Sequence, residues 1–284
     1  ADAKTYLGLQ DYFSMEGLSY KFVPIHSPGG NANTGFGKVD VDKMYNNLMK
    51  NYRWGNLDKK GVHADYYVRR TMTNNYRLLF LNLGQHLAAE GKTAETRIES
   101  LNRNIKMLED TLKSGKVPVD KVNAEIAKSK AEIPALEKKK TEMYAKLKNL
   151  MRKCFDVMPE ENVPFDRIVP SMVPLVLQCG DMELGKKLMR RILLLESENL
   201  AYYTSLSPRF SMGTAESASI SYRIIRLLEG TVQEFKLTDL ENEIKAKKAM
   251  ADASLQGWMK RLQEYDVENG TSYYGEVMKS FQQG

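Results

Sequence analysis

The feature that most constrains this chain of 284 residues is a glycine–aspartate pair between two helical patterns. Apolar residues recur at helical spacing over residues 168–179 and again over 182–195, with Gly180 and Asp181 between them. A glycine that ends one periodic segment and an aspartate that opens the next indicate a helix stop followed by a helix start. Because the turn is so short, we expect the two helices to pack antiparallel as a hairpin.

A second hairpin pattern is found earlier in the chain. Residues 166–199 resemble a tetratricopeptide repeat, in which the turn falls at Gly180-Asp181 and a small residue, here Gly185, lies where the helices cross. A related copy begins at residue 77 with the large–small pair Leu83-Gly84, which lets a partner helix approach closely. The sequence therefore predicts tetratricopeptide-like helical hairpins, each repeat stacking on the next.

The first of these hairpins is interrupted. After Thr96 the residues that should end the second helix of the repeat are missing. The expected ending reappears as "LKNLMRKCFDVMPEEN" at residues 147–162. Between these points apolar residues recur at alternating steps of three and four, first over 98–112 and, after "SGKVP", over 122–150. This spacing is typical of a coiled-coil seam. It predicts an inserted antiparallel coiled-coil arm at about residues 96–143.

The expected fold is therefore mainly α in three parts. Residues 1–70 form a small mixed segment that packs on the stack, with a short strand within 19–25 and a helix that Asp40 caps. Residues 71–199 form the two hairpins, the first of them interrupted by the arm. Residues 200–284 form a degenerate third hairpin and C-terminal capping helices, with Thr238 and Glu241 as a predicted capping box.

The sequence contains no recognisable catalytic constellation. "GGNANTGFGK" at residues 29–38 has the wrong spacing for a phosphate-binding loop, and the three histidines form no metal motif. Asp40 and Asp42 resemble the paired aspartates of some sugar transferases, but a helix cap explains them more simply. Cys154 and Cys179 are expected to be buried thiols, with a disulfide between them as the alternative. We expect no enzyme activity, no cofactor and no metal.

The net charge of +6 is concentrated in the arm. Residues 96–148 hold thirteen Lys or Arg and eight Asp or Glu, and Lys138, Lys139 and Lys140 are the densest group. Such a cluster would suit phosphate or anionic lipid headgroups, although solvated lysines along an exposed arm are commoner. Tyr144 is the one aromatic residue in this region that could stack on a base. A nucleic-acid partner is therefore disfavoured.

Several segments carry a resemblance to a known family. "YLGLQDYFSMEGLSYKFVPI" (6–25), "VDKMYNNLMKNYRWGN", "RRTMTNNYRLLFLNLGQHLAAEGK", "CFDVMPEENVPFD" and "ENLAYYTSLSPRF" are the segments concerned. Together they resemble the C-terminal soluble region of bacterial multi-span membrane proteins of unknown function, a family related to animal transmembrane protein O-mannosyltransferases. The charged arm departs from that pattern.

The resemblance implies a parent protein whose membrane region binds a lipid-linked sugar donor and holds the catalytic acidic residues. That region has no counterpart in this sequence, so no catalytic position can be carried over. The resemblance places the present chain on the extracytoplasmic, periplasmic face of the bacterial inner membrane, as part of a membrane protein.

Three hypotheses follow. The leading one is a non-catalytic interaction module that binds a peptide or protein surface, including the parent's own membrane region. The alternative is a free-standing cytoplasmic helical-repeat scaffold whose basic arm binds an anionic partner. A third is a soluble transferase that uses Asp40 and Asp42. The candidate partner-binding residues of the first, for which packing against the stack is an equal alternative, are Tyr12, Tyr20, Tyr45, Trp54, Asn82 and Gln85.

Overall fold

The structure of the protein is a computed structural model that describes residues 7–26, 38–113 and 119–282. It is mainly α-helical with a small mixed sheet near the N-terminus, as the sequence predicts. The chain divides into two compact units, residues 1–181 and residues 182–284. Each unit is described below by itself.

The N-terminal sheet has three short strands in the order β2-β1-β3. The single-turn helix η2 (Gln10–Tyr12) leads into β1 (Phe13–Met15), which pairs antiparallel with β2 (Tyr20–Phe22) and parallel with β3 (Lys38–Val39). The strand expected within residues 19–25 is therefore β2. The glycine-rich segment expected to be a loop lies almost entirely outside the described residues.

The predicted capped helix follows the sheet. Helix α1 (Val41–Asn46) begins after Asp40, whose carboxylate accepts a hydrogen bond from the backbone N–H of Lys43 at 3.0 Å. The cap interpretation of Asp40 is therefore confirmed. The helix continues as the π-helical segment η3 (Asn47–Asn51), and α1 packs on α3.

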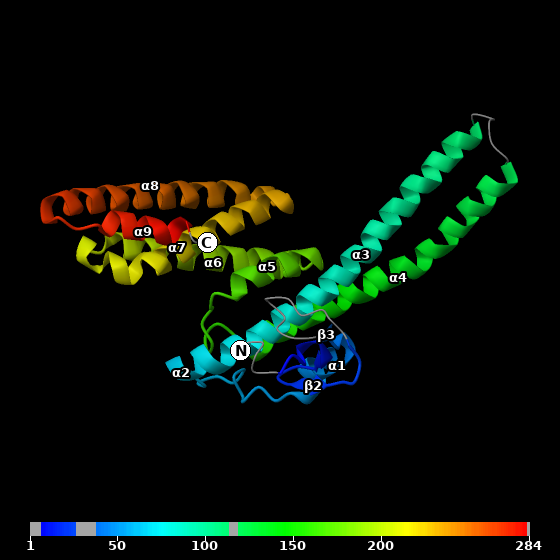
Figure 1. The fold of residues 1–284 in the computed structure, drawn as a ribbon, viewed down its shortest axis with the longest axis horizontal. Helices are drawn as coiled ribbons and strands as arrows, with labels where there is room; N and C mark the ends of the chain where they lie inside the picture. The colour runs from blue at the N-terminus through cyan, green and yellow to red at the C-terminus, as the bar shows by residue number, and fades with distance from the viewer. Residues whose placement is uncertain (1–6, 27–37, 114–118, 283–284) are drawn as a thin grey trace. The chain divides into compact units, whose positions relative to one another are not determined.

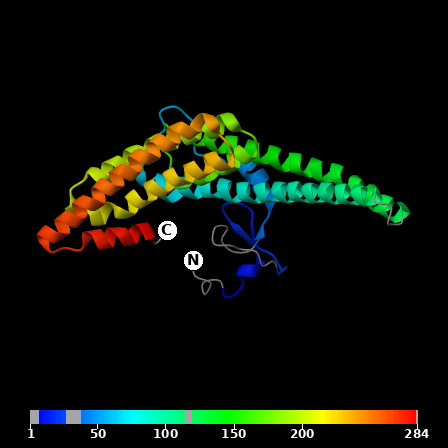
Figure 2. The same ribbon diagram turned by 90° about the horizontal axis from the view of Figure 1, so that it is seen from above.

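Two long helices form the frame of the first unit. A helical entry, α2 (Tyr66–Val68) and the π-helical η4 (Arg69–Thr73), leads into α3 (Asn74–Lys113), and α4 (Val119–Val157) returns beside it (Figure 1). Figure 2 shows the same two helices side by side from a second direction. Both are continuous across residues 96 and 143. The arm is therefore a continuation of the same two helices, and its origin as an insertion stays a prediction.

Close packing at two glycines confirms that α3 and α4 are the two sides of one hairpin. A Cβ atom built on Gly84 would lie 2.8 Å from the methyl carbon of Met151 and 3.4 Å from a methyl carbon of Leu147. One built on Gly91 would lie 2.5 Å from the Tyr144 ring. A side chain at Gly91 would overlap the Tyr144 ring, and one at Gly84 would require the ends of the neighbouring side chains to shift. The α3 segment before the arm therefore packs on the α4 segment after it.

The seam between the two helices continues into the arm. There Ile105, Val122 and Ile126 form a buried cluster, with Leu108, Leu112 and Ile133 packed against it. The buried residues of both helices follow the three-and-four spacing of a coiled coil. On α3 they include Phe80, Gly84, Leu87, Gly91, Ala94, Ile98, Leu101 and Ile105, and on α4 Val122, Ile126, Ser129, Met143, Leu147, Leu150, Cys154 and Val157.

A buried arginine fixes the chain after α4. The guanidinium of Arg77, on α3, is 1% exposed and lies 2.9 Å from the carboxylate of Asp166. It also donates hydrogen bonds to the carbonyl oxygens of Val163 and Pro164, at 2.7 and 2.8 Å. These contacts hold the segment that leads into α5 (Val169–Gln178), which packs on α3 and α4.

The predicted helix stop at Gly180 is confirmed. Gly180 has a positive φ of 79°, and its N–H donates to the carbonyl of Leu177 while that of Asp181 donates to Val176. This is the Schellman arrangement that commonly ends a helix. The boundary between the compact units falls directly after Asp181, inside the expected second hairpin. Pairing of the flanking helices in one repeat therefore stays a prediction.

The second unit consists of four helices that pack on one another. They are α6 (Met182–Ser205), α7 (Ser211–Glu234), α8 (Thr238–Asn269) and α9 (Tyr273–Gln282), with the short η5 (Pro208–Phe210) between α6 and α7.

Two sequence expectations fail in this unit. The boundary expected between residues 199 and 200 lies inside α6, because the apolar periodicity continues through the buried Leu200 to Thr204. The expected capping box is not formed either. Thr238 is already the first residue of α8, Leu237 occupies the cap position, and no side chain makes a cap hydrogen bond there.

Candidate interaction surfaces

An aromatic cluster lies on the N-terminal sheet. Phe13 and Phe22 are cross-strand partners with ring centroids 6.2 Å apart, and Phe13 also contacts Tyr20 at 6.1 Å. Tyr12 extends the cluster, with its ring 6.1 Å from Phe22 and 5.5 Å from His26. We call Tyr12, Phe13, Tyr20 and Phe22 the aromatic cluster.

This cluster is only partly covered. Tyr20 is 40% exposed and Phe22 54% exposed, while Leu18 and Ile25 of the same segment are also exposed. Aromatic side chains that combine a large apolar area with few rotatable bonds are enriched at protein interfaces. The cluster therefore has the composition of a protein-binding surface.

The hairpin that presents the cluster is anchored to the helices. Tyr52 accepts a hydrogen bond from the N–H of Leu18 at 2.9 Å, and Asn47 donates to the carbonyl of Glu16 at 2.7 Å. Lys43 lies 2.9 Å from the Glu16 carboxylate, and this hydrogen bond raises the pKa of Lys43. Gly17 at the turn has a φ of 138° and no room for a side chain beside Tyr52. The turn is therefore held in one place.

The structure separates the predicted partner-binding residues. Tyr12 and Tyr20 come together in the aromatic cluster, but Trp54 is buried at 9% exposure, with its ring 5.2 Å from Phe80. Asn82 is 2% exposed. Trp54 and Asn82 therefore pack inside the protein, which was the alternative to partner contact left open by the sequence.

Tyr45 and Gln85 are intermediate cases. Both are half-buried, and the ammonium group of Lys146 lies 5.9 Å from the centre of the Tyr45 ring. They come from α1 and α3, whereas the aromatic cluster belongs to β1, β2 and the turn before them. No measured contact joins either residue to the aromatic cluster in the described part of the chain.

Sequence reasoning missed Phe13 and Phe22. Their signal was available, because residues 20 and 22 alternate with polar Lys21 and so share one face of the strand. Phe13 could not be placed without the register of β1 against β2.

The three consecutive lysines of the arm do not form one surface. Successive residues of an α-helix point about 100° apart, so Lys138, Lys139 and Lys140 face different directions. Lys138 and Lys139 are exposed and Lys140 is half-buried. The ammonium group of Lys139 lies 3.1 Å from the carboxylate of Glu90. The charge of the cluster is therefore spread and partly neutralised.

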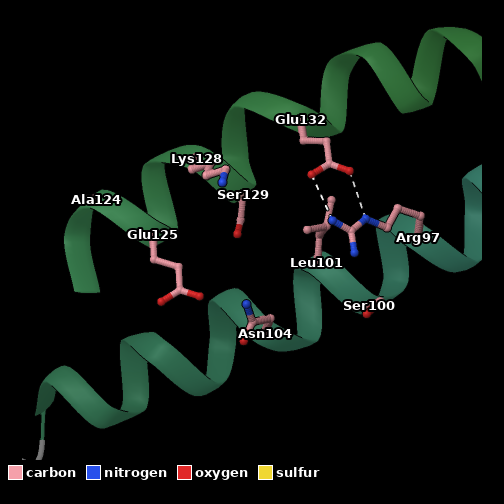
Figure 3. A pocket seen from close by; sticks show the side chains of 9 residues that line it. All are labelled: Arg97, Ser100, Leu101, Asn104, Ala124, Glu125, Lys128, Ser129 and Glu132. Carbon is pink, nitrogen blue, oxygen red and sulfur yellow. Dashed lines mark hydrogen bonds and ion pairs between the residues drawn. The ribbon is translucent and has the colours of Figure 1, made fainter. Parts of the chain in front are cut away.

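A cavity opens between α3 and α4 in the middle of the arm (Figure 3). Its volume is about 590 Å³. Arg97 spans the two helices beside it with a two-pronged ion pair to Glu132, at 2.9 and 3.1 Å. This pair raises the pKa of Arg97 and lowers that of Glu132. The lining residues are Arg97, Ser100, Leu101, Asn104, Ala124, Glu125, Lys128, Ser129 and Glu132.

The cavity coincides with a small polar residue in the seam. Ser129 occupies a position at which the neighbouring repeats have Ile126 and Ile133, and its side chain is too short to fill the space beside Leu101. Ser129 is 7% exposed. Its hydroxyl group has no hydrogen-bond partner in the described part of the chain (Figure 3). The lining is otherwise mainly polar and includes both signs of charge.

The remaining side chains that could bind a metal or act as nucleophiles form no site within the ranges that the structure describes. Cys154 and Cys179 are free thiols, and burial raises the pKa of both. Among the described residues, the His, Cys, Asp and Glu side chains form no group of three that could hold a metal ion. No helix in the described ranges is long and apolar enough to cross a membrane.

In comparisons with known proteins, the chain matches no protein-family model, no curated protein and no solved structure.

Proposed function

We propose that this chain is a non-catalytic interaction module that binds a protein or peptide surface through the aromatic cluster. The carrying observation is the partly exposed group of Tyr12, Phe13, Tyr20 and Phe22 on a hairpin whose turn is fixed to α1 and η3. A rigid surface loses little conformational freedom on binding, and tyrosine, as at Tyr12 and Tyr20, is enriched among the few residues that supply most of the energy at protein interfaces.

The sequence resemblance supports a specific setting for this module. In the proposed setting it is the extracytoplasmic part of a glycosyltransferase-like membrane protein, and the parent's own membrane region is among its partners. The aromatic cluster lies within residues 6–25, one of the segments that carry the resemblance. The cytoplasmic alternative depends on the lysine cluster, whose spread directions and pairing with Glu90 favour it less.

Site-directed photo-crosslinking tests the binding surface. A benzophenone amino acid is placed at Phe22 in the protein expressed from its complete gene in its own cells. We expect irradiation to produce a covalent adduct with a protein. The same group at Tyr202, an exposed aromatic residue of the second unit, serves as the control and should give no such adduct. Absence of an adduct at position 22, or equal adducts at both positions, would overturn the proposal.

Cysteine labelling in cells distinguishes the two settings. Val267 is exposed, so Val267→Cys should react with a membrane-impermeant maleimide wherever reagent reaches it. The extracytoplasmic proposal predicts labelling when the outer membrane alone is permeabilised. Labelling that requires rupture of the inner membrane would instead support the cytoplasmic scaffold.

A further inference from the structure

A stripe of alternating charge runs along α4 beside the arm cavity. Lys121, Glu125, Lys128 and Glu132 are separated by four, three and four residues, a spacing that places them on one face of a helix. Glu125, Lys128 and Glu132 also line the cavity, as Figure 3 shows. We call these four residues the charge stripe.

Most of the charge stripe is not used within the chain. Glu132 is held by Arg97, but Lys121, Glu125 and Lys128 make no ion pair in the part of the chain that the structure describes. Other charges of the arm are paired between α3 and α4, such as Lys130 with Glu109 at 3.0 Å. Within α4, each lysine of the stripe precedes its glutamate by four residues, which is the weaker order for an intrahelical pair.

The order of charges makes the stripe complementary to itself. Read from its N-terminal end the stripe is Lys-Glu-Lys-Glu, and read backwards it is Glu-Lys-Glu-Lys. Two copies placed antiparallel therefore bring Lys121 opposite the partner's Glu132, and Glu125 opposite the partner's Lys128. We propose that the arm is a self-association surface, and that its occupant is the charge stripe of a second copy of this chain.

The position of the two-fold axis makes this pairing sterically feasible. The axis falls between Ile126 and Ala127, close to the N-terminal end of α4. The overlap spans roughly 16 Å of helix at about 1.5 Å per residue. From the axis the two copies extend in opposite directions, so the bases of the two arms do not meet. An antiparallel contact of this kind closes after two copies.

The surface beside the stripe permits close approach. Ala124, an exposed small residue, lies beside the stripe on α4. Small alanine side chains let a partner helix come near, while the charges fix its register. Because exposed ion pairs are weak and are screened by salt, the dimer is expected to be weak and to dissociate at high ionic strength. This inference is independent of the proposed function of the aromatic cluster.

Charge reversal provides the test, with the whole chain followed by sedimentation velocity over a concentration series. The wild type should form a dimer in about 0.05 M salt and dissociate in about 0.5 M salt. In a dimer of Glu125→Lys, the new lysine faces the partner's Lys128 at two symmetric places. In a dimer of Lys128→Glu, the new glutamate faces the partner's Glu125 in the same way. Each variant alone should weaken the association by at least about tenfold.

Two combinations should restore association. An equimolar mixture of the Glu125→Lys and Lys128→Glu proteins should form a heterodimer, because the lysines of one copy then face the glutamates of the other. The double variant Glu125→Lys/Lys128→Glu should form a homodimer again. The control Glu137→Lys, at an exposed position of the same helix outside the stripe, makes the same change in net charge as Glu125→Lys and should associate as the wild type does.

The outcomes are decisive. A wild type that stays monomeric at low salt overturns the inference, as does a dimer that neither single reversal weakens. Failure of the mixture and of the double variant to associate would also overturn it, because both restore the opposed charges. Unchanged helical circular dichroism in each variant is expected, since the substituted side chains are exposed.

Discussion

At the residue scale, Gly91 sets the distance between the two long helices. A Cβ atom at this position would lie 2.5 and 2.9 Å from ring carbons of Tyr144, closer than carbon atoms can pack. Gly91→Ala should therefore destabilise the protein by about 1–3 kcal/mol through overpacking, measured by denaturant unfolding.

The matched control for Gly91 is Gly230. This glycine lies in α7 with open space around it, so Gly230→Ala should stabilise its helix by about 0.5–1 kcal/mol. Equal effects of the two alanine substitutions would contradict the close approach at Gly91.

Arg77 is the second residue on which the first unit depends. Arg77→Met removes the partner of Asp166 and leaves the carbonyl groups of Val163 and Pro164 without their donor. Breaking a buried ion pair by removal of one member typically destabilises a protein by about 3–5 kcal/mol. Thermal unfolding should show this loss, whereas Arg53→Met, at an exposed arginine of the same unit, should have little effect.

His86 gives the stability a pH dependence. Burial lowers the pKa of His86, partly opposed by Glu90. The unfolded chain therefore binds a proton there at a pH where the folded chain does not, and stability should fall as the pH drops through about 6.5. His86→Gln should reduce this fall between pH 7.5 and 5.5 in denaturant titrations, while His63→Gln, at an exposed histidine, should leave it in place. An unchanged pH profile in the His86 variant would contradict the role given to its burial.

At the element scale, Ser129 is a buried polar residue beside a cavity in the seam of the arm. Ser129→Leu should fill part of the cavity beside Leu101 and stabilise the pairing of α3 with α4 by about 1–2 kcal/mol. Hydrogen exchange should slow at the amides of α4 on both sides of the substitution. Ser100→Leu, at an exposed position of the same cavity, should not slow it, and equal protection in both variants would argue against the seam assignment.

The sequence predicted the α3–α4 hairpin because its signals were local and periodic. Leu83-Gly84 marked the close approach, and the three-and-four spacing carried the seam into the arm. The close approach at Gly91 was not predicted, and α3 is continuous through it. In the same spacing Ser129 lies between Ile126 and Ile133. Because it is polar, it was not predicted to be a seam residue, and the cavity beside it was not predicted either.

Other features required tertiary information. The helix α6 passes residue 199 because packing of Leu200 and Thr204 outweighs the end of the repeat pattern. The aromatic cluster depends on the register between β1 and β2, which places Phe13 opposite Phe22. Burial of Trp54 likewise depends on a contact with Phe80, far along the chain. Such pairings between distant segments leave no periodic trace in the sequence.

At the scale of the whole molecule, both proposed binding surfaces, the aromatic cluster and the charge stripe, lie in the first compact unit. Within residues 1–181 one hairpin contacts α1 and η3, to which the turn of the N-terminal sheet is hydrogen-bonded, and continues outward as the arm. The aromatic cluster and the charge stripe therefore lie on the same frame but on different elements. Binding at one is expected to leave the other accessible.

The side-by-side pairing of α3 and α4 is the central feature of the fold, and a cysteine cross-link measures it directly. In a Cys179→Ser background, Arg97→Cys and Glu132→Cys replace side chains whose charged groups lie 2.9 Å apart. Because these two side chains are long, a short bismaleimide reagent rather than a disulfide should join the two cysteines within one chain, as detected by the mass of a peptide pair after proteolysis. The control pair, Arg97→Cys with Lys121→Cys, should remain unlinked. Joining of the control pair as readily as the first pair, or no link in either, would contradict the single hairpin.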